Sequence, residues 1–489
     1  MGRPAGGAQA EAERSFRLAH PEYGRTRSLD ELRTRDYGRL DRLGHVYLDY
    51  TGSGLYADFQ VQEHAKLLLG DVLGNPHSTN PSSLRSTKMV EEARAAVLAF
   101  FNASPDEYAV VFTQNASGAL KLVGEAFPFG PRSTFLLSFD NHNSVNGIRE
   151  YARAARARVR YAPVIPPDLR LDEPALRELL DQRDPSAPNL FAFPAQSNFS
   201  GVRHCLEWVS RARDRGWQVL LDAAAFVPTA RLDLDAVRPD FTAVSFYKIF
   251  GYPTSVGCLI ARKAALAGLR RPWFAGGTIT VASVRGDRHY LQEGPEAFED
   301  GTLNFLGLPA VTLGLRYVEG IGIDKISLRT SCLLEWLLGE LSALRHANGR
   351  NVVRIYGPTR PTARGATVTF NIYDPEGRFI DHAAVEQMAG ASMISVRTGC
   401  FCNPGAGEVA LGIEAAELAT CFAGADQRLT LDDFRRCIDG KSTGAVRASL
   451  GVASNFADVF RFVEFARGFV DRPAAGSERA SRAISPAPG

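Results

Sequence analysis

The chain has 489 residues, of which 45% are hydrophobic and 22% are charged, and these fractions are ordinary for a globular protein. At roughly 100–200 residues per domain, this length predicts about two to four domains. The net charge of +2 excludes a dedicated nucleic-acid binder. No apolar run is long enough to cross a membrane, and the charged N-terminus lacks the apolar stretch of a secretion signal. Seven cysteines, thinly spread, do not form the pattern of a disulfide framework. We therefore expect a cytoplasmic protein that binds neither nucleic acid nor membrane.

Residues 1–27 and 472–489 are rich in Ala, Gly, Pro, Ser and Arg, and we expect both segments to be flexible tails. Between them, short apolar runs alternate with amphipathic helical patterns. The expected strands are Val110–Thr113, Thr134–Ser138, Val159–Pro163, Leu190–Pro194, Gln218–Asp222, Phe241–Phe246 and Gly257–Ile260. The expected helices between them include Lys88–Asn102, Ser117–Ala126, Asn146–Ala157, Pro174–Gln182 and Leu206–Arg215. This alternation predicts an α/β fold with a mainly parallel sheet that is covered on both faces.

The pattern changes after about Gly314. A long helix is expected over Lys325–His346, followed by a strand at Thr367–Ile372, a helix at His382–Met388 and a strand at Met393–Val396. We therefore divide the chain into a large domain, residues 28–314, and a smaller α+β domain, residues 315–471. We expect the N-terminal segment of the large domain to pack on the small one.

Two side chains that could carry chemistry follow apolar strands. Asp222 ends the first of these strands and Lys248 closes the second. The carboxyl ends of parallel strands meet at one edge of the sheet, where ligands bind. Each residue also has a plain structural interpretation, Asp222 as a helix cap and Lys248 as a lysine whose amine reaches water. Together they match what pyridoxal phosphate needs, a lysine for a Schiff base and a carboxylate for the pyridinium nitrogen.

A phosphate group would need hydrogen-bond donors near that edge. The stretch from Phe112 to Leu120 combines a strand end, small polar residues and the start of a helix, whose free N–H groups favour anions. This motif is weak by itself, because any serine-capped helix looks similar. Its position before Asp222 and Lys248 nevertheless suits a pyridoxal-phosphate site.

The chain resembles fold-type I pyridoxal-phosphate enzymes of the class V aminotransferase family, and especially the cysteine-desulfurase-like N-terminal domain of molybdenum cofactor sulfurases. The resemblance extends from about Val46 to Val470. The stretches that carry it are Tyr47-Leu-Asp, Gly74-Asn-Pro-His-Ser, Asp140-Asn-His142, Pro194-Ala-Gln-Ser-Asn198, Ser245-Phe-Tyr-Lys248, Phe298-Glu-Asp-Gly-Thr302, Arg397-Thr-Gly-Cys-Phe-Cys402 and the segment from Asp439 to Arg447.

The resemblance implies roles for individual residues. Lys248 matches the Schiff-base lysine, Asp222 the partner of the pyridinium nitrogen and His142 the histidine that stacks on the ring. Asn198 matches a side chain near the ring substituents. Contacts to the cofactor phosphate are matched by Ala116, Ser117, Ser245 and Tyr247. Thr278 and Thr302 match residues that reach the phosphate from a second subunit, which implies a homodimer.

The resemblance also assigns two arginines to the substrate. Arg397 and Arg447 match arginines that bind the substrate carboxylate, for which a planar guanidinium is suited. The residues alone leave plainer interpretations open, because either arginine could form a surface ion pair and His142 could be an ordinary loop histidine. Ala225 stands where general cysteine desulfurases have a glutamine, and this departure favours the narrower sulfurase-like group.

Cys400 and Cys402 lie in a loop rich in Gly, Asn and Pro, where a thiol is more reactive than a buried one such as Cys258. We expect no metal site, because no nearby His or Cys completes a ligand set. A disulfide between these two cysteines would be strained. In the family resemblance, Cys402 matches the cysteine that forms a persulfide, and Cys400 is a helper or a bystander. We expect the glycines to let this loop move.

These expectations describe a pyridoxal-phosphate-dependent cysteine desulfurase, a sulfurtransferase that converts L-cysteine to L-alanine. A Cys402 persulfide would then pass its sulfur to an unidentified acceptor, either a protein or a small molecule. Other class V chemistry remains an alternative, namely a C–S or selenocysteine lyase, an aminotransferase or an epimerase. Sulfuration of molybdenum cofactor would need a separate cofactor-binding partner. A sulfur carrier without catalytic activity is a further alternative.

Overall fold

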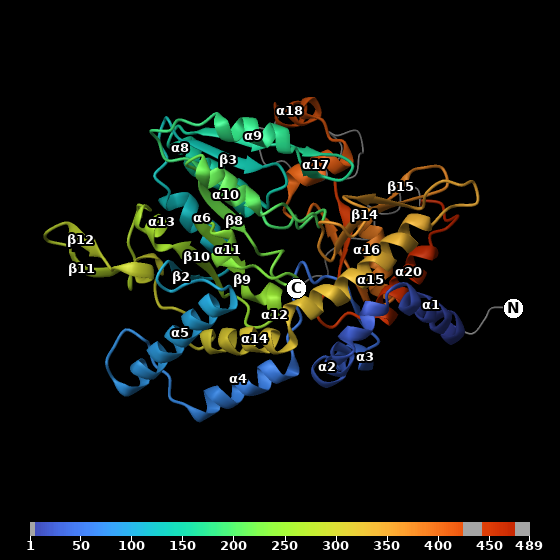
Figure 1. Cartoon of the computed structure of the whole chain (residues 1–489), viewed down its shortest axis with the longest axis horizontal. Coiled ribbons are helices and arrows are strands. Elements are labelled where there is room, and N and C mark those ends of the chain that lie inside the picture. Colours follow the sequence, from blue (N-terminus) through green and yellow to red (C-terminus); the bar gives the residue numbers. More distant parts are fainter. Residues whose placement is uncertain (1–4, 424–442, 475–489) are drawn as a thin grey trace, which may run out of the picture.

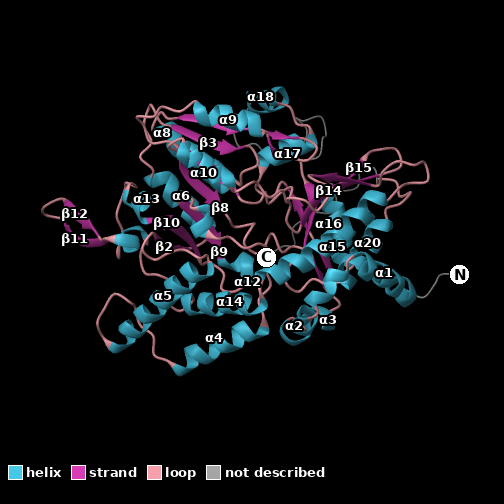
Figure 2. Ribbon diagram, viewed as in Figure 1, coloured by secondary structure: helices cyan, strands magenta, loops and turns pink. Residues whose placement is uncertain are grey.

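The computed structural model describes residues 5–423 and 443–474. A seven-stranded sheet forms the centre of the larger part of the molecule (Figures 1 and 2). Its strands lie in the order β2 (Tyr108–Thr113), β10 (Gly257–Arg262), β9 (Phe241–Ser245), β8 (Gln218–Asp222), β7 (Leu190–Pro194), β3 (Thr134–Ser138) and β4 (Arg158–Ala162). Strand β10 is antiparallel to both of its neighbours, and the other pairs are parallel. This arrangement confirms the predicted α/β fold with a mainly parallel sheet.

Alternate side chains of each central strand enter different cores. In β7, Phe191 and Phe193 pack into one apolar cluster, whereas Leu190 and Ala192 pack into another on the opposite face. Both faces are covered by helices, which explains why these strands are apolar throughout. The helices of this part are α4 (Asp58–Gly70), α5 (Pro81–Phe100), α6 (Ala116–Ala126), α7 (Asn143–Asn146), α8 (Ile148–Ala154), α9 (Glu173–Asp181), α10 (Glu207–Asp214), α11 (Leu234–Val237), α12 (Phe246–Phe250), α13 (Lys263–Ala267) and α14 (Leu308–Ile321).

The smaller part contains an antiparallel sheet and three main helices. The sheet has the order β13 (Val353–Tyr356), β14 (Thr367–Tyr373), β18 (Ala445–Ser449) and β17 (Arg397–Gly399), with β15 (Phe379–Ile380) also paired to β14. The helices are α15 (Ile323–Ala343), α16 (His382–Ala391) and α20 (Phe456–Arg467). Strand β1 (Val46–Tyr47) pairs in parallel with β16 (Ile394–Ser395). Helices α17 (Pro404–Leu411) and α18 (Ala415–Ala423) follow the cysteine-containing segment.

The two cores meet within helix α15. Ile323 and Ile326, at its start, belong to the core of the larger part, whereas the residues from Cys332 to Leu341 belong to the core of the smaller part. The change from one core to the other therefore falls within this helix. The predicted domain boundary between residues 314 and 315 stays a prediction.

The N-terminal residues form a structured segment of α1 (Ala5–Ala19), η1 (Pro21–Thr26), α2 (Ser28–Asp36) and α3 (Arg39–Arg42). The prediction of a flexible tail over residues 1–27 is therefore wrong for residues 5–26. Phe16 and Tyr23 are buried, and the Phe16 ring stacks on Phe456 of α20 with a centroid distance of 4.8 Å. The composition of this segment misled the prediction, because a few large apolar residues anchor it. Of the other expected tail, residues 475–489 lie outside the described residues.

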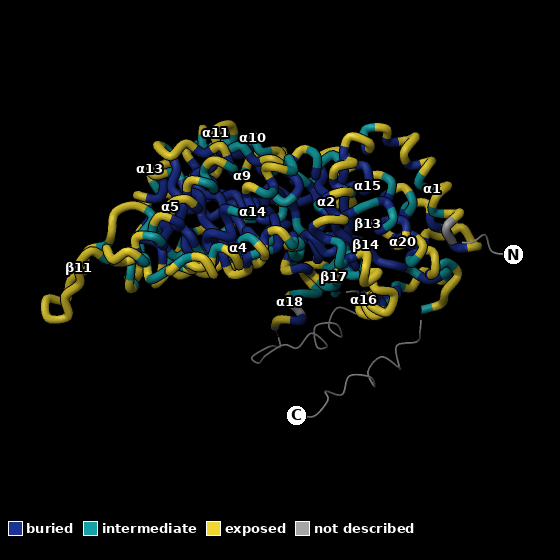
Figure 3. The backbone as a smooth tube through the Cα atoms, turned by 90° about the horizontal axis from the view of Figure 1, so that it is seen from below, coloured by how far each residue is buried: buried dark blue, intermediate teal, exposed yellow. Residues whose placement is uncertain are grey.

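Smaller elements surround these two parts. A hairpin of β11 (Ile279–Ser283) and β12 (Arg288–Leu291) projects from the body and is largely exposed (Figure 3). Strands β5 (Val164–Ile165) and β6 (Arg170–Leu171) form a second short hairpin, and η2 (Gly294–Phe298) follows β12. Within the described residues, no helix is both long enough and apolar enough to cross a membrane.

The packing of α1 can be tested by comparing two residues of the same helix. Phe16 is 1% exposed, and we expect Phe16→Ala to lower the free energy of unfolding by about 3 kcal/mol, because it removes a buried ring. Leu18 is 84% exposed, so Leu18→Ala should leave stability nearly unchanged. Urea denaturation followed by circular dichroism measures both. Equal midpoints for the two variants would show that α1 does not pack on the body.

Candidate active site

The site lies at the carboxyl edge of the large sheet. Strands β8 and β9 are parallel neighbours, with Asp222 opposite Ala243. As predicted, Asp222 ends β8. Lys248 does not close β9, however, because the strand ends at Ser245 and the lysine lies one turn further on, in α12. The helix stops at Gly251, which has a φ of +78° that favours glycine.

A cavity of about 320 Å³ opens at this edge. It brings together nearly all residues of this chain that were predicted to contact the cofactor, which are Ala116, Ser117, His142, Asn198, Asp222, Ser245, Tyr247 and Lys248. Ala225 also lines the cavity, in agreement with its place near Asp222 in the sequence. Residues that the sequence analysis did not assign complete the wall, among them Asn115, Ser144, Gln196, Thr254 and Ser255.

Burial brings the Lys248 amine closer to its neutral form. Desolvation lowers the pKa of Lys248, and the nearby Asp222 carboxylate opposes this effect by stabilising the ammonium. A lysine must be neutral to attack a carbonyl carbon and to accept a proton. The lowered pKa therefore favours the neutral Lys248 amine, which can both attack a carbonyl carbon and accept a proton.

His142 is held as a neutral ring with a defined tautomer. Its Nδ1 accepts a hydrogen bond from the Ser144 backbone N–H at 3.1 Å, so the proton of the neutral ring is on Nε2. Burial lowers the pKa of His142, although Asp222 partly opposes this shift. The residue is also the N-cap of α7, which fixes its position at the cavity wall.

The N-terminus of α6 forms another wall of the cavity. Asn115 caps this helix by accepting a hydrogen bond from Gly118 N–H at 3.0 Å. The Ala116 N–H donates to Ser245 Oγ at 2.9 Å, and the hydroxyls of Ser117 and Ser144 lie 2.6 Å apart. The N–H groups of Ala116 and Gly118 are thus already engaged, whereas the serine hydroxyls at the positive end of this helix dipole suit a phosphate.

The two predicted carboxylate-binding arginines share an internal carboxylate. Arg397 and Arg447 face each other on strands β17 and β18, and both donate to Asp49. The hydrogen bonds to Asp49 raise the pKa of Arg397, whereas burial lowers the pKa of Arg447 to about 10. Arg447 Nε is buried without a hydrogen-bond partner among the described residues. Arg447 therefore has a donor left for a substrate carboxylate, whereas Arg397, whose side chain is half exposed, is largely engaged by Asp49.

Cys402 is exposed on a turn that is anchored on both sides. Phe401 is buried against Phe199. The Arg447 guanidinium lies over the Phe401 ring, with its Cζ 4.6 Å from the ring centroid. On the other side, the fully buried Asn403 donates to the Asp140 carbonyl at 2.7 Å. The Cys402 carbonyl itself accepts a hydrogen bond from Asn143 N–H at 2.7 Å. These long-range contacts hold the turn in the described conformation, and the movement that the glycines led us to expect stays a prediction.

Asn198 contacts this turn as well as the cavity. Its Nδ2 donates to the Phe401 carbonyl at 2.7 Å, and its Oδ1 accepts from Asn403 Nδ2 at 2.9 Å. Both ends of the amide are thus engaged by the residues that flank Cys402. The geometry makes Asn198 a support of the cysteine turn, in addition to the predicted position near the ring.

Thr278 and Thr302 do not line the cavity of their own chain. Thr278 is buried and its hydroxyl bonds to Ala275, whereas Thr302 lines a neighbouring cavity of about 690 Å³. The two cavities share Asn115 and Ser255, so Thr302 lies close to the helix-α6 end of the site. Residues 439–442 of the segment that leads to Arg447 lie outside the described residues.

The donor set fits pyridoxal phosphate. A carboxylate on β8, an amine with a lowered pKa on α12, a neutral imidazole and the N-terminus of α6 surround one cavity. These groups correspond to the ring nitrogen, the aldehyde carbon, the ring face and the phosphate of that cofactor.

The comparisons with known proteins agree with this geometry. The chain belongs to the aminotransferase class-V family, whose model matches residues 46–462. Pyridoxal phosphate is the cofactor of this family. The cysteine desulfurase of Thermococcus onnurineus is 24% identical, and its structure superposes with a TM-score of 0.73 over 90% of this chain and 97% of that one. The cysteine desulfurase CsdA of Escherichia coli is 20% identical, with a TM-score of 0.71 over 89% of this chain and 97% of that one. These structures establish the fold.

Among characterised relatives, the molybdenum cofactor sulfurase of Bos taurus is 40% identical over 91% of this chain and 52% of its own length. The molybdenum cofactor sulfurase of Arabidopsis thaliana is 37% identical over 90% of this chain and 58% of its own length. This chain thus spans about half the length of the curated relatives that it matches.

Two glycines of α17 test the anchoring of the cysteine turn. A side chain at Gly405 would collide with the Phe139 carbonyl oxygen, so Gly405→Ala should displace the turn and cost about 1–3 kcal/mol of stability. Gly407 is a matched control, because its new methyl group would meet only Phe199, at 3.8 Å. We expect Gly405→Ala to slow alkylation or sulfur loading of Cys402 relative to Gly407→Ala. Equal rates for the two variants would contradict a packed turn.

The electrostatic coupling across the cavity gives a second prediction. Asp222 raises the pKa of both His142 and Lys248, so Asp222→Asn should lower both values further. Nuclear magnetic resonance titration of His142 in the cofactor-free protein measures the first shift. Asp324→Asn, at an exposed and remote position, is the control and should leave the titration unchanged. A rise of the His142 pKa in Asp222→Asn would refute the assigned contact.

Proposed function

We propose that this protein is a pyridoxal-phosphate-dependent cysteine desulfurase that converts L-cysteine to L-alanine and holds the sulfur as a Cys402 persulfide. The observation that carries the proposal is the placement of Cys402. Its thiol is exposed, and it lies close enough to Lys248 and Arg447 to favour their charged forms. A nucleophilic sulfur at that point would meet the sulfur of a substrate whose carboxylate is bound by Arg447.

The residues of the chain divide the work of substrate binding. Arg447, oriented by Asp49, binds the substrate carboxylate through its unpaired Nε–H. Lys248, with its lowered pKa, accepts the proton from the substrate Cα. His142 carries its proton on Nε2 and offers it at the cavity wall. When bound, pyridoxal phosphate supplies the electron sink that weakens the substrate C–S bond.

The sulfur transfer then balances without an added oxidant. The Cys402 thiolate attacks the substrate sulfur, so an S–S bond forms while the C–S bond breaks. The electron pair of the C–S bond stays with the substrate carbon, which takes up a proton and becomes the methyl group of alanine. A thiol of the acceptor finally attacks the outer sulfur of the persulfide and restores the Cys402 thiolate.

We also propose that the enzyme is a homodimer in which a second subunit completes the phosphate site. The hairpin of β11 and β12 projects from the body of its own chain (Figure 3). Its apolar residues Val281, Val284 and Tyr290 are exposed. Thr302 lies in a cavity that adjoins the site. Sedimentation equilibrium of the holoenzyme should give twice the chain mass of 53.2 kDa.

A second candidate function is sulfuration of molybdenum cofactor held by a separate partner protein. It is favoured by the 40% and 37% identity to the two molybdenum cofactor sulfurases, which this chain matches over about half their length. In that case the desulfurase chemistry is the same and only the acceptor differs. Transfer of labelled sulfur from the persulfide to added acceptors would distinguish the two.

Two cysteine variants test the proposed reaction. The holoenzyme with L-cysteine and a thiol reductant should release alanine and sulfide in equal amounts. Cys402→Ser should keep the visible absorbance of the bound cofactor and lose more than about 99% of both products, because it removes the nucleophile. Cys400→Ser is the matched control, since Cys400 is also exposed, and it should retain most activity.

Other products would redirect the assignment. Pyruvate and ammonia in place of alanine would indicate a C–S lyase. A strict need for a keto acid would indicate an aminotransferase. Wild-type sulfide release by Cys402→Ser would exclude Cys402 as the sulfur carrier while leaving the cofactor site intact.

A further inference from the structure

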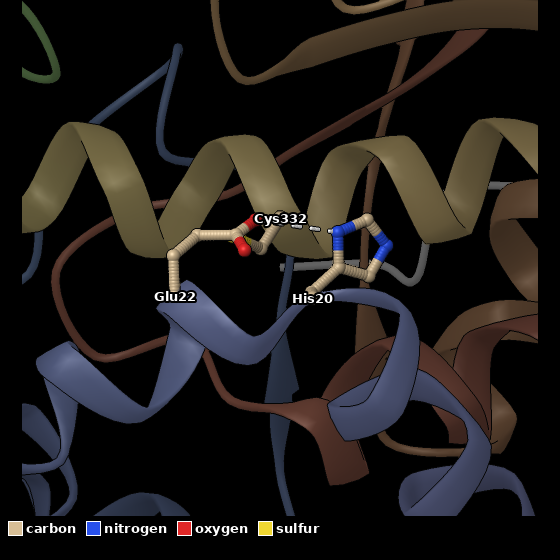
Figure 4. Close-up of side chains that lie close together, drawn as sticks. All are labelled: His20, Glu22 and Cys332. Carbon is tan, nitrogen blue, oxygen red and sulfur yellow. Dashed lines mark hydrogen bonds and ion pairs between the residues drawn. The ribbon is translucent and has the colours of Figure 1, made fainter.

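A cluster of metal-ligating side chains lies far from the active-site cavity, between the N-terminal segment and α15. His20 is the N-cap of η1, Glu22 lies in the first turn of η1, and Cys332 comes from α15 (Figure 4). Their ligand atoms, His20 Nδ1, a Glu22 carboxylate oxygen and Cys332 Sγ, all lie within 4.8 Å of one another. Glu335, one helical turn beyond Cys332 and therefore on the same face of α15, adds a second carboxylate.

The separations of the ligand atoms in this cluster are compatible with a shared cation. His20 Nδ1 is 3.6 Å from Glu22 Oε1 and 3.9 Å from Glu335 Oε2, both too long for a hydrogen bond. Cys332 Sγ donates a hydrogen bond to Glu22 Oε1 at 3.3 Å, and a metal ion would replace the proton of that bond. Ligand atoms around a tetrahedral zinc ion, with bonds of about 2.0–2.3 Å, are separated by about 3.3–3.6 Å. The ligand atoms of His20, Glu22 and Cys332 would have to close from separations of up to 4.8 Å, and the Glu335 carboxylate would have to turn toward them to complete a tetrahedral site.

The surroundings hold the ligands and leave a path to solvent. His20 and Cys332 are buried, and the His20 ring is packed against Phe16 at a centroid distance of 5.0 Å. The side chains of Glu22 and Glu335 are 40% and 52% exposed, so a hydrated ion can reach them. Two carboxylates gather on one imidazole and one thiol here, which leaves negative charge for a divalent cation to balance.

We propose that His20, Glu22, Cys332 and Glu335 form a binding site for a zinc-like divalent cation that fastens the N-terminal segment to α15. One sulfur, one nitrogen and two oxygen ligands match the preference of zinc and cobalt, and the thiol disfavours magnesium and calcium. The thiol is protonated in the metal-free protein, because burial and the neighbouring Glu22 carboxylate raise the pKa of Cys332 to about 12. On binding, an S–metal bond replaces the S–H bond, the proton passes to solvent and the ion loses bound water.

This site does not depend on the proposed reaction. Its ligands belong to the core of the smaller part and to the segment that the sequence analysis took for a flexible tail. No local pattern indicates this cluster, because His20 and Glu22 lie about 310 residues before Cys332.

Cobalt(II) is the probe, because it replaces zinc and reports thiolate ligation in its absorption spectrum. The 489-residue holoenzyme used in this test carries Cys400→Ser and Cys402→Ser, which remove the exposed thiols of the active-site turn. We expect one cobalt ion per chain, with visible bands of tetrahedral geometry and a thiolate charge-transfer band, all abolished by added zinc. In this background, Cys332→Ser should remove the charge-transfer band and His20→Ala should weaken binding at least roughly tenfold.

Two further variants keep the test decisive. Cys205→Ser, at an exposed cysteine elsewhere, should leave the spectrum unchanged. Glu335→Gln, at a half-exposed position, should weaken cobalt binding without affecting folding, which the cofactor absorbance monitors. Zinc should raise the thermal midpoint of Cys205→Ser and not that of Cys332→Ser. Absence of a thiolate band, or its survival in Cys332→Ser, would overturn the proposal.

Discussion

The Asp49 carboxylate is the interaction on which the substrate end of the site depends. Arg397 and Arg447 lie directly opposite each other on β17 and β18, where their positive charges would repel in the absence of a counter-ion. Asp49 binds both guanidinium groups, and its own backbone pairs with Ser449 at the end of β18. Three stretches that are distant in the sequence are therefore tied together by one carboxylate. The same contact holds Arg447 in a buried position and leaves its Nε–H without a partner among the described residues. A buried, unpaired donor of this kind can bind an anion strongly.

The segment that carries Asp49 also supports the lysine. A few residues further on, the Gly54 N–H donates to the Tyr247 carbonyl at 3.0 Å, directly beside Lys248. A side chain at Gly251 would collide with the backbone at Leu55 and Tyr56, so α12 and this segment pack with no room between them. The position of the amine and the position of the guanidinium are thus set by the same stretch of chain. On the opposite wall, Asn198 and Asn403 hold the cysteine turn, so the three reactive groups are all supported by buried contacts.

Local patterns were sufficient for the central sheet and insufficient for the contacts that position the site. The strands from β2 to β10 are short apolar runs between helices, and parallel pairing then places Asp222 and Lys248 at one edge. Asp49 was visible only as part of a motif, because its partners are about 350 and 400 residues away. Phe401 and Cys402 both have φ values near +55°, in the left-handed region. Residues other than glycine rarely adopt this conformation, so the sequence does not predict it. The polar composition of residues 1–27 likewise concealed Phe16 and Tyr23, whose burial depends on α15 and α20.

The stacking of Phe16 on Phe456 has a consequence for how the protein folds as it is synthesised. The apolar clusters of the large sheet draw mainly on residues between Val90 and Ile326, with a few later additions between Tyr356 and Ala445, so most of that core exists while the ribosome is still at work. The other core needs Phe16, Val46 and Leu48 together with residues up to Phe469. The N-terminal segment, which leaves the ribosome first, can therefore be buried only after the residues of α20 near the C-terminus have been synthesised. Until then its apolar residues are open to chaperones, and translation speed over the C-terminal third sets how long that exposure lasts.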